Sequence, residues 1–281
     1  MTHLLLLRKS SARQLAAKYF YVLQMGIQNT LVYRFNFLCR AVFNLVPLIA
    51  MIALWQTIYA GRGEEVSSYT ITQMICYYLL VIIIDALTSV TEDDWQVAAD
   101  IKEGHISQFL VRPIDYLSYR LCLFLSGRLV FTLAAAGPVL AFLVWQQEYF
   151  LPPVNPTTFA CFLLSLVFSA LLQFFMSYVM AMLAFWVLEI SSFVFALLAC
   201  QRLLGGQMFP IDILPSGLTG ILLFTPFPYQ SFFPASIYLG RVAGSTLALG
   251  LFIQLGWVVL AWFLARFCWE RGLRSYAAVG G

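Results

Sequence analysis

The chain has 281 residues, of which 62% are hydrophobic and only 10% are charged, and its mean hydropathy is +0.85. Soluble globular domains average about 45–50% apolar and about 25% charged residues, so this composition excludes a soluble domain and predicts an integral membrane protein. The formal net charge is only +3, which gives no reason to expect a nucleic-acid partner.

The first predicted element is an amphipathic helix over residues 13–31. Its apolar face consists of Leu15, Tyr19, Val22, Leu23, Gly26 and Ile27. Basic amphipathic helices ahead of a first span usually lie in the lipid headgroup region, so residues 1–34 are predicted to form a cytoplasmic, interfacial segment. A direct docking role for this helix is the alternative. The opening MTHLLLLRKS has too short an apolar run for a signal peptide, and we expect no cleavage there.

Apolar runs long enough for a membrane-spanning helix, which needs about 20 residues, follow along the chain. They cover residues 41–60, 69–90, 121–145, 159–188 and 243–267, with a shorter sixth run at residues 191–204. The predicted fold class is therefore an all-α integral membrane protein, with a six-span transmembrane domain over residues 35–281. The period-two alternation typical of a membrane barrel is absent from the sequence.

Lysine and arginine predict the orientation of these spans. They gather before the first span, between the second and third, and after the last, as Arg8, Lys9, Arg13, Lys18, Lys102, Arg112, Arg120, Arg271 and Arg274. Positive charge marks the cytoplasmic side. We therefore expect a multi-pass protein of the cell (inner) membrane, with both termini and the segment at residues 96–117 in the cytoplasm.

The segment between the second and third spans contains DIKEGHISQFLVRP, residues 100–113. Ile106, Phe109 and Leu110 have i, i+3, i+4 spacing, which predicts one apolar face on a short helix that ends at Pro113. Such a face suits insertion into a groove on a cytoplasmic partner, with Phe109 as an anchor. Contact of this face with lipid headgroups is the alternative.

Two charges lie inside the predicted spans. Asp85 is near the cytoplasmic end of the second span and Arg128 is in the cytoplasmic part of the third, so adjacent antiparallel helices would bring them to similar depth. A charge at the centre of a spanning helix costs about 2.5–3.5 kcal/mol, which pairing lowers. The sequence thus predicts a structural ion pair. The alternative is an ion relay of a secondary transporter that uses Asp85.

Residues 207–241 are apolar but contain five prolines, too many for a spanning helix. Non-helical backbone at membrane depth is tolerated only where other parts of the protein, or the water in a cavity, satisfy its hydrogen bonds. We therefore predict short re-entrant helices that enter from the outer face. One of them covers residues 216–224, with Ser216 as N-cap. A proline-rich cap without a mechanistic part is the alternative.

The order of these features resembles the permeases of ABC-2 type ATP-binding cassette exporters. The outer motif consists of Gly205, Gly206, Phe209, Pro210, Leu214, Pro215, Pro226 and Tyr229. The inner motif, similar to I-K-x-G-x-(5)-L-x-R-P, consists of Ile101, Lys102, Gly104, Leu110, Arg112 and Pro113.

This resemblance implies a cytoplasmic coupling helix that docks on a separate ATPase. Its residues would be Asp100, Ile101, Lys102, Glu103, Gly104, His105, Ile106, Phe109, Leu110, Arg112 and Pro113. It also implies two ATPase subunits, a second permease chain, identical or homologous, and export. Aromatic richness and the scarcity of charge suit a drug-like, lipid or glycolipid cargo. A phosphate-binding loop needs a lysine after glycine, and none of the three lysines follows one, so ATP and Mg²⁺ are expected in the partner.

The chain lacks the residues that catalysis or metal binding would need in the membrane. His3 and His105 are the only histidines, and both lie outside the apolar runs. The six cysteines are scattered singly and are expected to be packing residues. We therefore expect no catalytic residue, no metal site and no cofactor bound by this chain. Besides an ion-coupled transporter, a non-transporting membrane scaffold is the remaining alternative.

Overall fold

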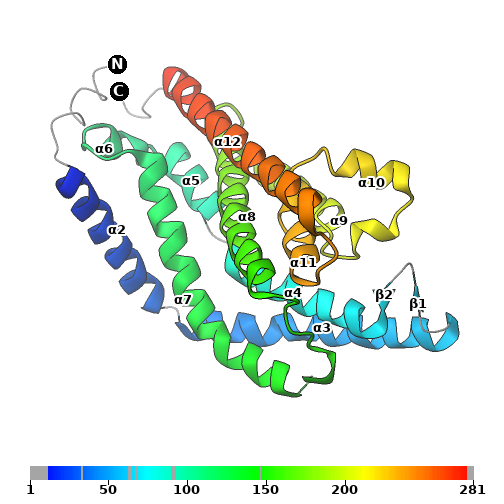
Figure 1. The fold of residues 1–281 in the computed structure, drawn as a ribbon. Helices are drawn as coiled ribbons and strands as arrows, with labels where there is room; N and C mark the ends of the chain where they lie inside the picture. Colours follow the sequence, from blue (N-terminus) through cyan, green and yellow to red (C-terminus); the bar gives the residue numbers. More distant parts are fainter. Residues whose placement is uncertain are drawn as a thin grey trace.

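The computed structural model describes residues 12–32, 34–62, 65–66, 69–89, 93–145 and 147–276, and most of them are helical (Figure 1). The α-helices are α2 (Ala12–Val32), α3 (Arg34–Arg62), α4 (Ile71–Thr88), α5 (Asp93–Lys102), α6 (Ile106–Leu110), α7 (Tyr116–Trp145), α8 (Pro156–Met182), α9 (Ser191–Leu204), α10 (Ser216–Leu222), α11 (Phe232–Tyr238) and α12 (Gly244–Ser275). The 3₁₀ turns are η1 (Gln147–Tyr149), η2 (Leu183–Phe185), η3 (Ile211–Ile213) and η4 (Phe227–Tyr229). Strands β1 (Glu65–Val66) and β2 (Tyr69–Thr70) pair antiparallel.

Within the described residues, four helical stretches are long and apolar enough to cross a membrane. They are Ile71–Thr88, Tyr116–Pro138, Pro156–Phe185 and Gly244–Ser275. They confirm a multi-pass all-α membrane protein. The expected run at residues 41–60 lies in α3, of which Ile49–Gly61 forms a shorter apolar helix, and the expected short span is α9, with 14 residues. Six crossings stay a prediction.

Helices α8 and α12 pack against each other at the centre of the molecule (Figure 1). Their buried polar side chains satisfy one another: Ser165 Oγ donates to Gln254 Oε1 at 2.9 Å, and Gln254 Nε2 donates to the Tyr229 carbonyl at 2.9 Å. On α12, Gly250 lies so close to the ring of Phe233 that an added Cβ would be 2.3 Å from it. This glycine makes room for the Phe233 ring of α11, a helix that is buried along its whole length.

Helix α12 extends between the two ends of the molecule. Its 32 residues make it about 48 Å long at 1.5 Å per residue. Near its last turns, the ring of Trp269 stacks on Tyr116 at 4.9 Å. Near its first turns it faces α10 across a pocket that includes Gly220 and Thr246. The charged segment at residues 96–117 and the proline-rich region at residues 207–241 therefore lie at opposite ends of α12 (Figure 1).

Helix α2 has the predicted apolar face, which packs against α7. Val22 and Gly26 are buried, and a Cβ added at Gly26 would lie 2.6 Å from Ser126 Oγ on α7. Ser126 Oγ also donates to the Leu23 carbonyl at 3.0 Å, and Lys18 Nζ donates to the Pro113 carbonyl. The helix thus runs along α7, because its apolar face and small Gly26 fit against α7. Its place in the lipid headgroup region stays a prediction.

The proline-rich region forms short helices, as predicted, but their details differ. Pro215 is the N-cap of α10 and Ser216 is its first helical residue, with no capping hydrogen bond from a side chain. The expected cap at Ser216 is therefore wrong by one residue, since proline at position 215 already provides the extended backbone that precedes a helix. Helix α10 is exposed, whereas α11 is completely buried in spite of Pro234.

Candidate functional site

The charged segment folds as two short helices joined by a left-handed glycine. Helix α5 ends at Lys102, Gly104 has a φ of +79°, and α6 begins at Ile106. The Ser107 hydroxyl donates to the Gly104 carbonyl at 2.7 Å and closes the turn. Only glycine adopts this backbone conformation without a steric penalty, so the turn is the structural reason for Gly104.

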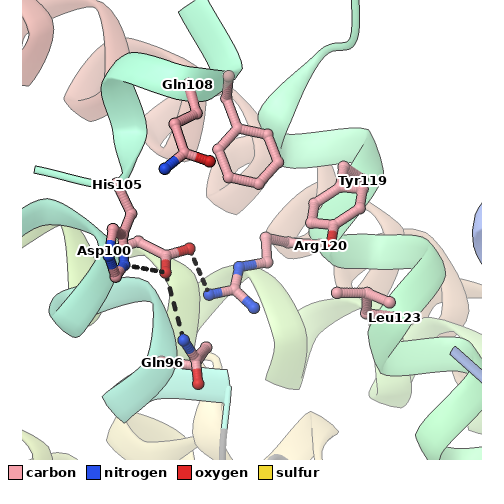
Figure 2. A pocket seen from close by; sticks show the side chains of 8 residues that line it. Gln96, Asp100, His105, Gln108, Tyr119, Arg120 and Leu123 are labelled. Carbon is pink, nitrogen blue, oxygen red and sulfur yellow. Dashed lines mark hydrogen bonds and ion pairs between the residues drawn. The ribbon is translucent and has the colours of Figure 1, made fainter. Parts of the chain in front are cut away.

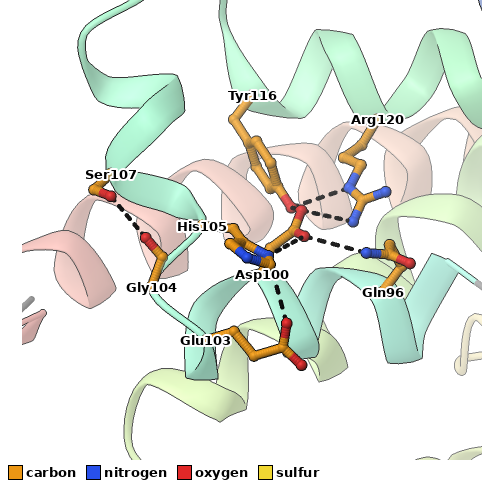
Figure 3. A network of polar contacts seen from close by, with 8 residues as sticks. All are labelled: Gln96, Asp100, Glu103, Gly104, His105, Ser107, Tyr116 and Arg120. Carbon is orange, nitrogen blue, oxygen red and sulfur yellow. Dashed lines mark hydrogen bonds and ion pairs between the residues drawn. The ribbon is translucent and has the colours of Figure 1, made fainter. Parts of the chain in front are cut away.

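A buried ion pair joins this segment to α7. Arg120 Nη2 lies 2.9 Å from Asp100 Oδ2, and the Tyr116 hydroxyl donates to the same oxygen at 2.7 Å (Figure 3). Gln96 Nε2 donates to Asp100 Oδ1 at 3.2 Å, and His105 Nδ1 lies 3.9 Å from that oxygen. Asp100 and Arg120 are only 7% and 3% exposed. Asp100, expected on a docking surface, is therefore an internal anchor.

The ion pair forms one wall of a pocket of about 430 Å³ (Figure 2). The pocket is lined by Gln96, Asp100, His105, Gln108, Phe109, Tyr119, Arg120 and Leu123. Among the described residues, no group of three or more His, Cys, Asp or Glu side chains could hold a metal ion. The polar groups of this wall are bonded mainly to one another, which is typical of a structural junction between helices.

The predicted apolar face of α6 exists, but it packs on the chain itself. Ile106 is fully buried, and the ring of Phe109 lies 5.0 Å from that of Tyr116 and 5.1 Å from that of Tyr119. Leu110 is half-buried. Ile101 on α5 is also buried, with 4% exposed. These side chains hold the segment in place. Phe109 is only half-buried, and its role as an anchor for a partner stays a prediction.

The surface that the segment leaves exposed is mostly polar and has one large apolar side chain. Its residues are Lys102, Glu103, His105, Ser107, Gln108, Val111, Arg112 and Pro113. Val111 is 83% exposed. Sequence reasoning missed Val111 because the i, i+3, i+4 pattern selected the face that is buried. Val111 lies just outside that pattern, next to Arg112 and Pro113, and this position was the signal that could have identified it as exposed.

Aromatic stacking connects the segment to the spanning helices. The rings of Tyr116 and Trp269 are nearly parallel, with an interplanar angle of 10°. Next to them, Arg266 of α12 forms an ion pair with Asp115. Burial raises the pKa of the Asp115 carboxyl, but hydrogen bonds from Arg266 and Ser118 outweigh burial and hold that pKa below its ordinary value. The segment is thus joined to α7 and α12 by several independent contacts.

The intramembrane charges lie near the end of α4. Arg128 Nη1 donates to the Ser89 hydroxyl at 3.2 Å, and the Ser89 N–H donates to the Asp85 carbonyl at 2.8 Å. The Arg128 guanidinium also lies over the ring of Phe131, 5.3 Å from its centroid. Arg128 therefore reaches Ser89, which follows Asp85 by one helical turn. A direct ion pair between their side chains stays a prediction.

The predicted outer motif surrounds the end of α9. The Gly205 carbonyl accepts the Phe232 N–H at 3.0 Å, and the Gly206 carbonyl accepts the Tyr77 hydroxyl at 2.5 Å. Gly206 has a φ of +82°, and an added Cβ would lie 2.7 Å from Phe232 Cβ. Of the other motif residues, Pro210 and Tyr229 are buried, Phe209, Leu214 and Pro226 are half-buried, and Pro215 is exposed. The two glycines thus allow α9 to end against α4 and α11.

A polar cluster that sequence reasoning missed lies beside this motif. Arg241 Nη2 is 3.0 Å from Asp212 Oδ2, and the Tyr69 hydroxyl donates to both oxygens of Asp212 at 3.0 Å. Arg241 also lies 3.8 Å from the centroid of the Tyr69 ring. Tyr69 is 143 positions from Asp212 in the sequence and Arg241 is 29 positions from it, so no local sequence pattern could reveal their contact.

Comparison with known proteins gives one family. A family model described as "ABC-2 family transporter protein" matches residues 45–280, which include the charged segment, the outer motif and all four long apolar helices. No curated protein sequence matches the chain significantly.

Proposed function

Because the chain belongs to the ABC-2 family of transporter proteins, we propose that it is the permease subunit of an ATP-driven exporter. The ATPase that powers it is a separate cytoplasmic protein. Its docking site on the permease is the exposed surface of α5, α6 and the following turn, from Lys102 to Pro113.

One observation carries this proposal: the segment is exposed on one side and rigidly anchored on the other. A coupling element has to receive force from a partner and pass it to the spans without bending. The Asp100–Arg120 ion pair and the Tyr116–Trp269 stack join the segment to α7 and α12. A displacement of the exposed side would therefore move both spanning helices together.

The family resemblance and the distribution of charge support the remaining parts of the proposal. Two ATPase subunits bind ATP and Mg²⁺, and a second permease chain completes the pathway. Lys18, Lys102, Arg112 and Arg274 lie near the same end of the molecule, and the positive-inside rule supports a cytoplasmic position for this end. The membrane that we propose is the cell (inner) membrane. The cargo is hydrophobic or amphiphilic.

The proposal is tested by placing a charge on the docking surface. Val111→Asp puts an uncompensated carboxylate on the most exposed apolar residue of the segment. We expect it to weaken ATPase association about tenfold or more, as loss of a binding hot spot does, and to reduce ATP hydrolysis by the purified complex in proportion. Val154→Asp is the matched control: Val154 is 68% exposed and precedes α8 at the opposite end.

Equal association and hydrolysis in both variants, with normal amounts in the membrane, would refute docking at this segment. A flux measurement on the same protein, reconstituted in vesicles, distinguishes ATP-driven transport from ion-coupled transport. If cargo flux continues without ATP hydrolysis and stops in Asp85→Asn when only a proton gradient drives it, the chain is a secondary transporter.

A further inference from the structure

A pocket of about 700 Å³ lies between α10, α11 and the first half of α12, at the end of the molecule opposite to α5 and α6. Apolar side chains form most of its wall, among them Phe224, Phe233 and Trp257. Pockets that bind small molecules have volumes of about 300–1,000 Å³, mainly apolar walls and a few convergent polar groups. None of the proposed docking residues lines this pocket.

The polar end of the pocket is the ion pair of Asp212 and Arg241. Both Nε and Nη2 of Arg241 lie within 3.1 Å of Asp212 Oδ2, and the Tyr69 hydroxyl also donates to this carboxylate. The side chains of Asp212 and Arg241 are 28% and 22% exposed, so the pair is accessible. Because the two charges cancel, this end offers donors and acceptors but no net charge, which suits a polar head group without net charge.

A buried hydroxyl in the pocket wall points to a bound ligand. Ser236 is 1% exposed, and within the described part of the chain its Oγ has no hydrogen-bond partner. It lines the same pocket as the ion pair. A buried hydroxyl without a partner is costly, and a ligand carbonyl at this position would accept its hydrogen bond. The wall therefore has one hydrogen-bonding position within an otherwise apolar stretch.

Helix α10, which borders the pocket, faces an apolar medium. Leu218, Ile221 and Phe224 follow one another at intervals of three residues and are 53%, 66% and 84% exposed. Leu218 and Ile221 lie on α10, and Phe224 lies two residues beyond its end. Three large exposed apolar side chains so close together are stable next to lipid and unfavourable in water. Molecules that reach the pocket past α10 therefore come from the bilayer.

From these four observations we infer that the pocket binds one acyl chain of a membrane amphiphile with an uncharged or zwitterionic head group. The chain lies against Phe233 and Trp257, an ester carbonyl accepts a hydrogen bond from Ser236, and the head group lies at Asp212 and Arg241. Bilayer phospholipid and free single-chain lipid share this chemistry. The site goes beyond the proposed transport function, because it requires no ATPase.

The inference is tested with the purified full chain and a photoreactive lysophosphatidylethanolamine that carries a diazirine in its acyl chain. We expect light-induced labelling to map to the stretches that line the pocket, residues 219–224, 232–236 and 246–257. Two unlabelled competitors then separate the sources of ligand: phosphatidylethanolamine in bicelles and free lysophosphatidylethanolamine. Competition by the bicelles identifies bilayer lipid, and competition only by the free compound identifies a single-chain lipid.

Two glycines of α10 provide a matched pair of variants. Gly220 lines the pocket and Gly217 does not, and an added Cβ meets no atom within 4 Å at either position. Gly220→Leu should reduce labelling about tenfold by filling the pocket, whereas Gly217→Leu should leave it unchanged. Ser236→Ala should also reduce labelling, yet it should not lower the melting temperature of the unliganded chain, since it removes an unsatisfied hydroxyl.

Equal labelling in the two glycine variants, or labelling spread over all lipid-facing helices, would overturn the inference. Labelling that disappears when two copies of the chain associate and cross-link through position 220 would assign the pocket to a protein interface instead. If Ser236→Ala lowered the melting temperature and left labelling intact, the hydroxyl would be structural and the proposed hydrogen bond to the ligand wrong.

Discussion

At the scale of single residues, Asp100 shows that a charged side chain can form a buried ion pair that joins two helices. The sequence presents it beside Lys102 and Glu103, in a stretch that cannot face lipid. In the structure the Asp100 side chain is buried, because Arg120 and Tyr116 lie one helical turn apart on α7 and both contact its carboxylate. Charge alone identified a polar segment, but it could not show which of the charges face a partner.

The Asp100–Arg120 pair should behave as a single energetic unit. Arg120→Met or Asp100→Asn alone leaves one buried group without its partner and should lower the free energy of unfolding by about 3–5 kcal/mol. The double variant should be more stable than the sum of the two losses predicts. Thermal unfolding of all four proteins in detergent measures this coupling, with Lys102→Gln as an exposed control. Additive losses would show that the two side chains act independently.

Asp115 makes a pH-dependent contribution to stability. Its pKa in the folded chain is lower than in the unfolded chain, so the unfolded state binds the proton more tightly. The contribution is complete above the ordinary aspartate pKa of about 3.9 and is lost as the pH falls through the lower folded value. The melting temperature should therefore drop on acidification below about pH 4, and the drop should be smaller in Asp115→Asn.

Glu270→Gln provides the control for this titration. Glu270 is exposed and lies one turn beyond Arg266 on α12, so its substitution should preserve the acid-induced drop. An unchanged drop in Asp115→Asn would mean that the pair with Arg266 contributes nothing to the pH dependence.

At the scale of elements, the joint between α5 and α6 depends on one glycine. Any other L-residue at a φ of +79° is strained by about 1–2 kcal/mol, so Gly104→Ala should destabilise the chain and loosen the docking surface. Gly137→Ala is a matched control, because Gly137 lies inside helix α7 with no atom within 4 Å of an added Cβ. We expect the control to be neutral or slightly stabilising. The melting temperatures of both variants and their ATPase association provide the measurement.

The elements themselves were largely predictable. The apolar runs and the amphipathic pattern anticipated α2, α4 and α9 to within two residues at each end. They also located α7, α8 and α12, but α7 begins five residues earlier than expected, α8 ends six residues earlier and α12 ends eight residues later. Prolines correctly indicated short helices between α9 and α12. The neighbour of each face could not be predicted, because periodicity shows that a face is apolar but not whether lipid, a partner or the same chain covers it. The faces of α2 and α6 are both covered by α7.

At the scale of the whole molecule, we expect the two ends of α12 to lie on opposite sides of the membrane. After replacement of the native cysteines, Ser216→Cys should react with an impermeant thiol reagent added outside intact cells. Ser107→Cys should react only after the cells are opened, although both positions are exposed. Labelling of residue 216 only from the cytoplasm would reverse the topology.

Contacts between distant segments define the candidate sites, and they were the least predictable features. Arg241 reaches Asp212 from the turn before α12, Tyr69 reaches it from strand β2, and Trp269 reaches Tyr116 from the last helix. A single sequence records the residues but not these pairings. The family match spans the region that contains all of these residues, and it supports a transporter without specifying cargo or direction.

The central claim is that the exposed side of the 96–117 segment binds a separate ATPase. A photo-crosslinking amino acid at position 111, introduced into the full chain in its native membrane, tests it most directly. We predict a covalent adduct with a cytoplasmic protein that contains a phosphate-binding loop, and no such adduct from position 154. Absence of that adduct from positions 102, 107, 111 and 112, in protein that is correctly inserted, would contradict the claim.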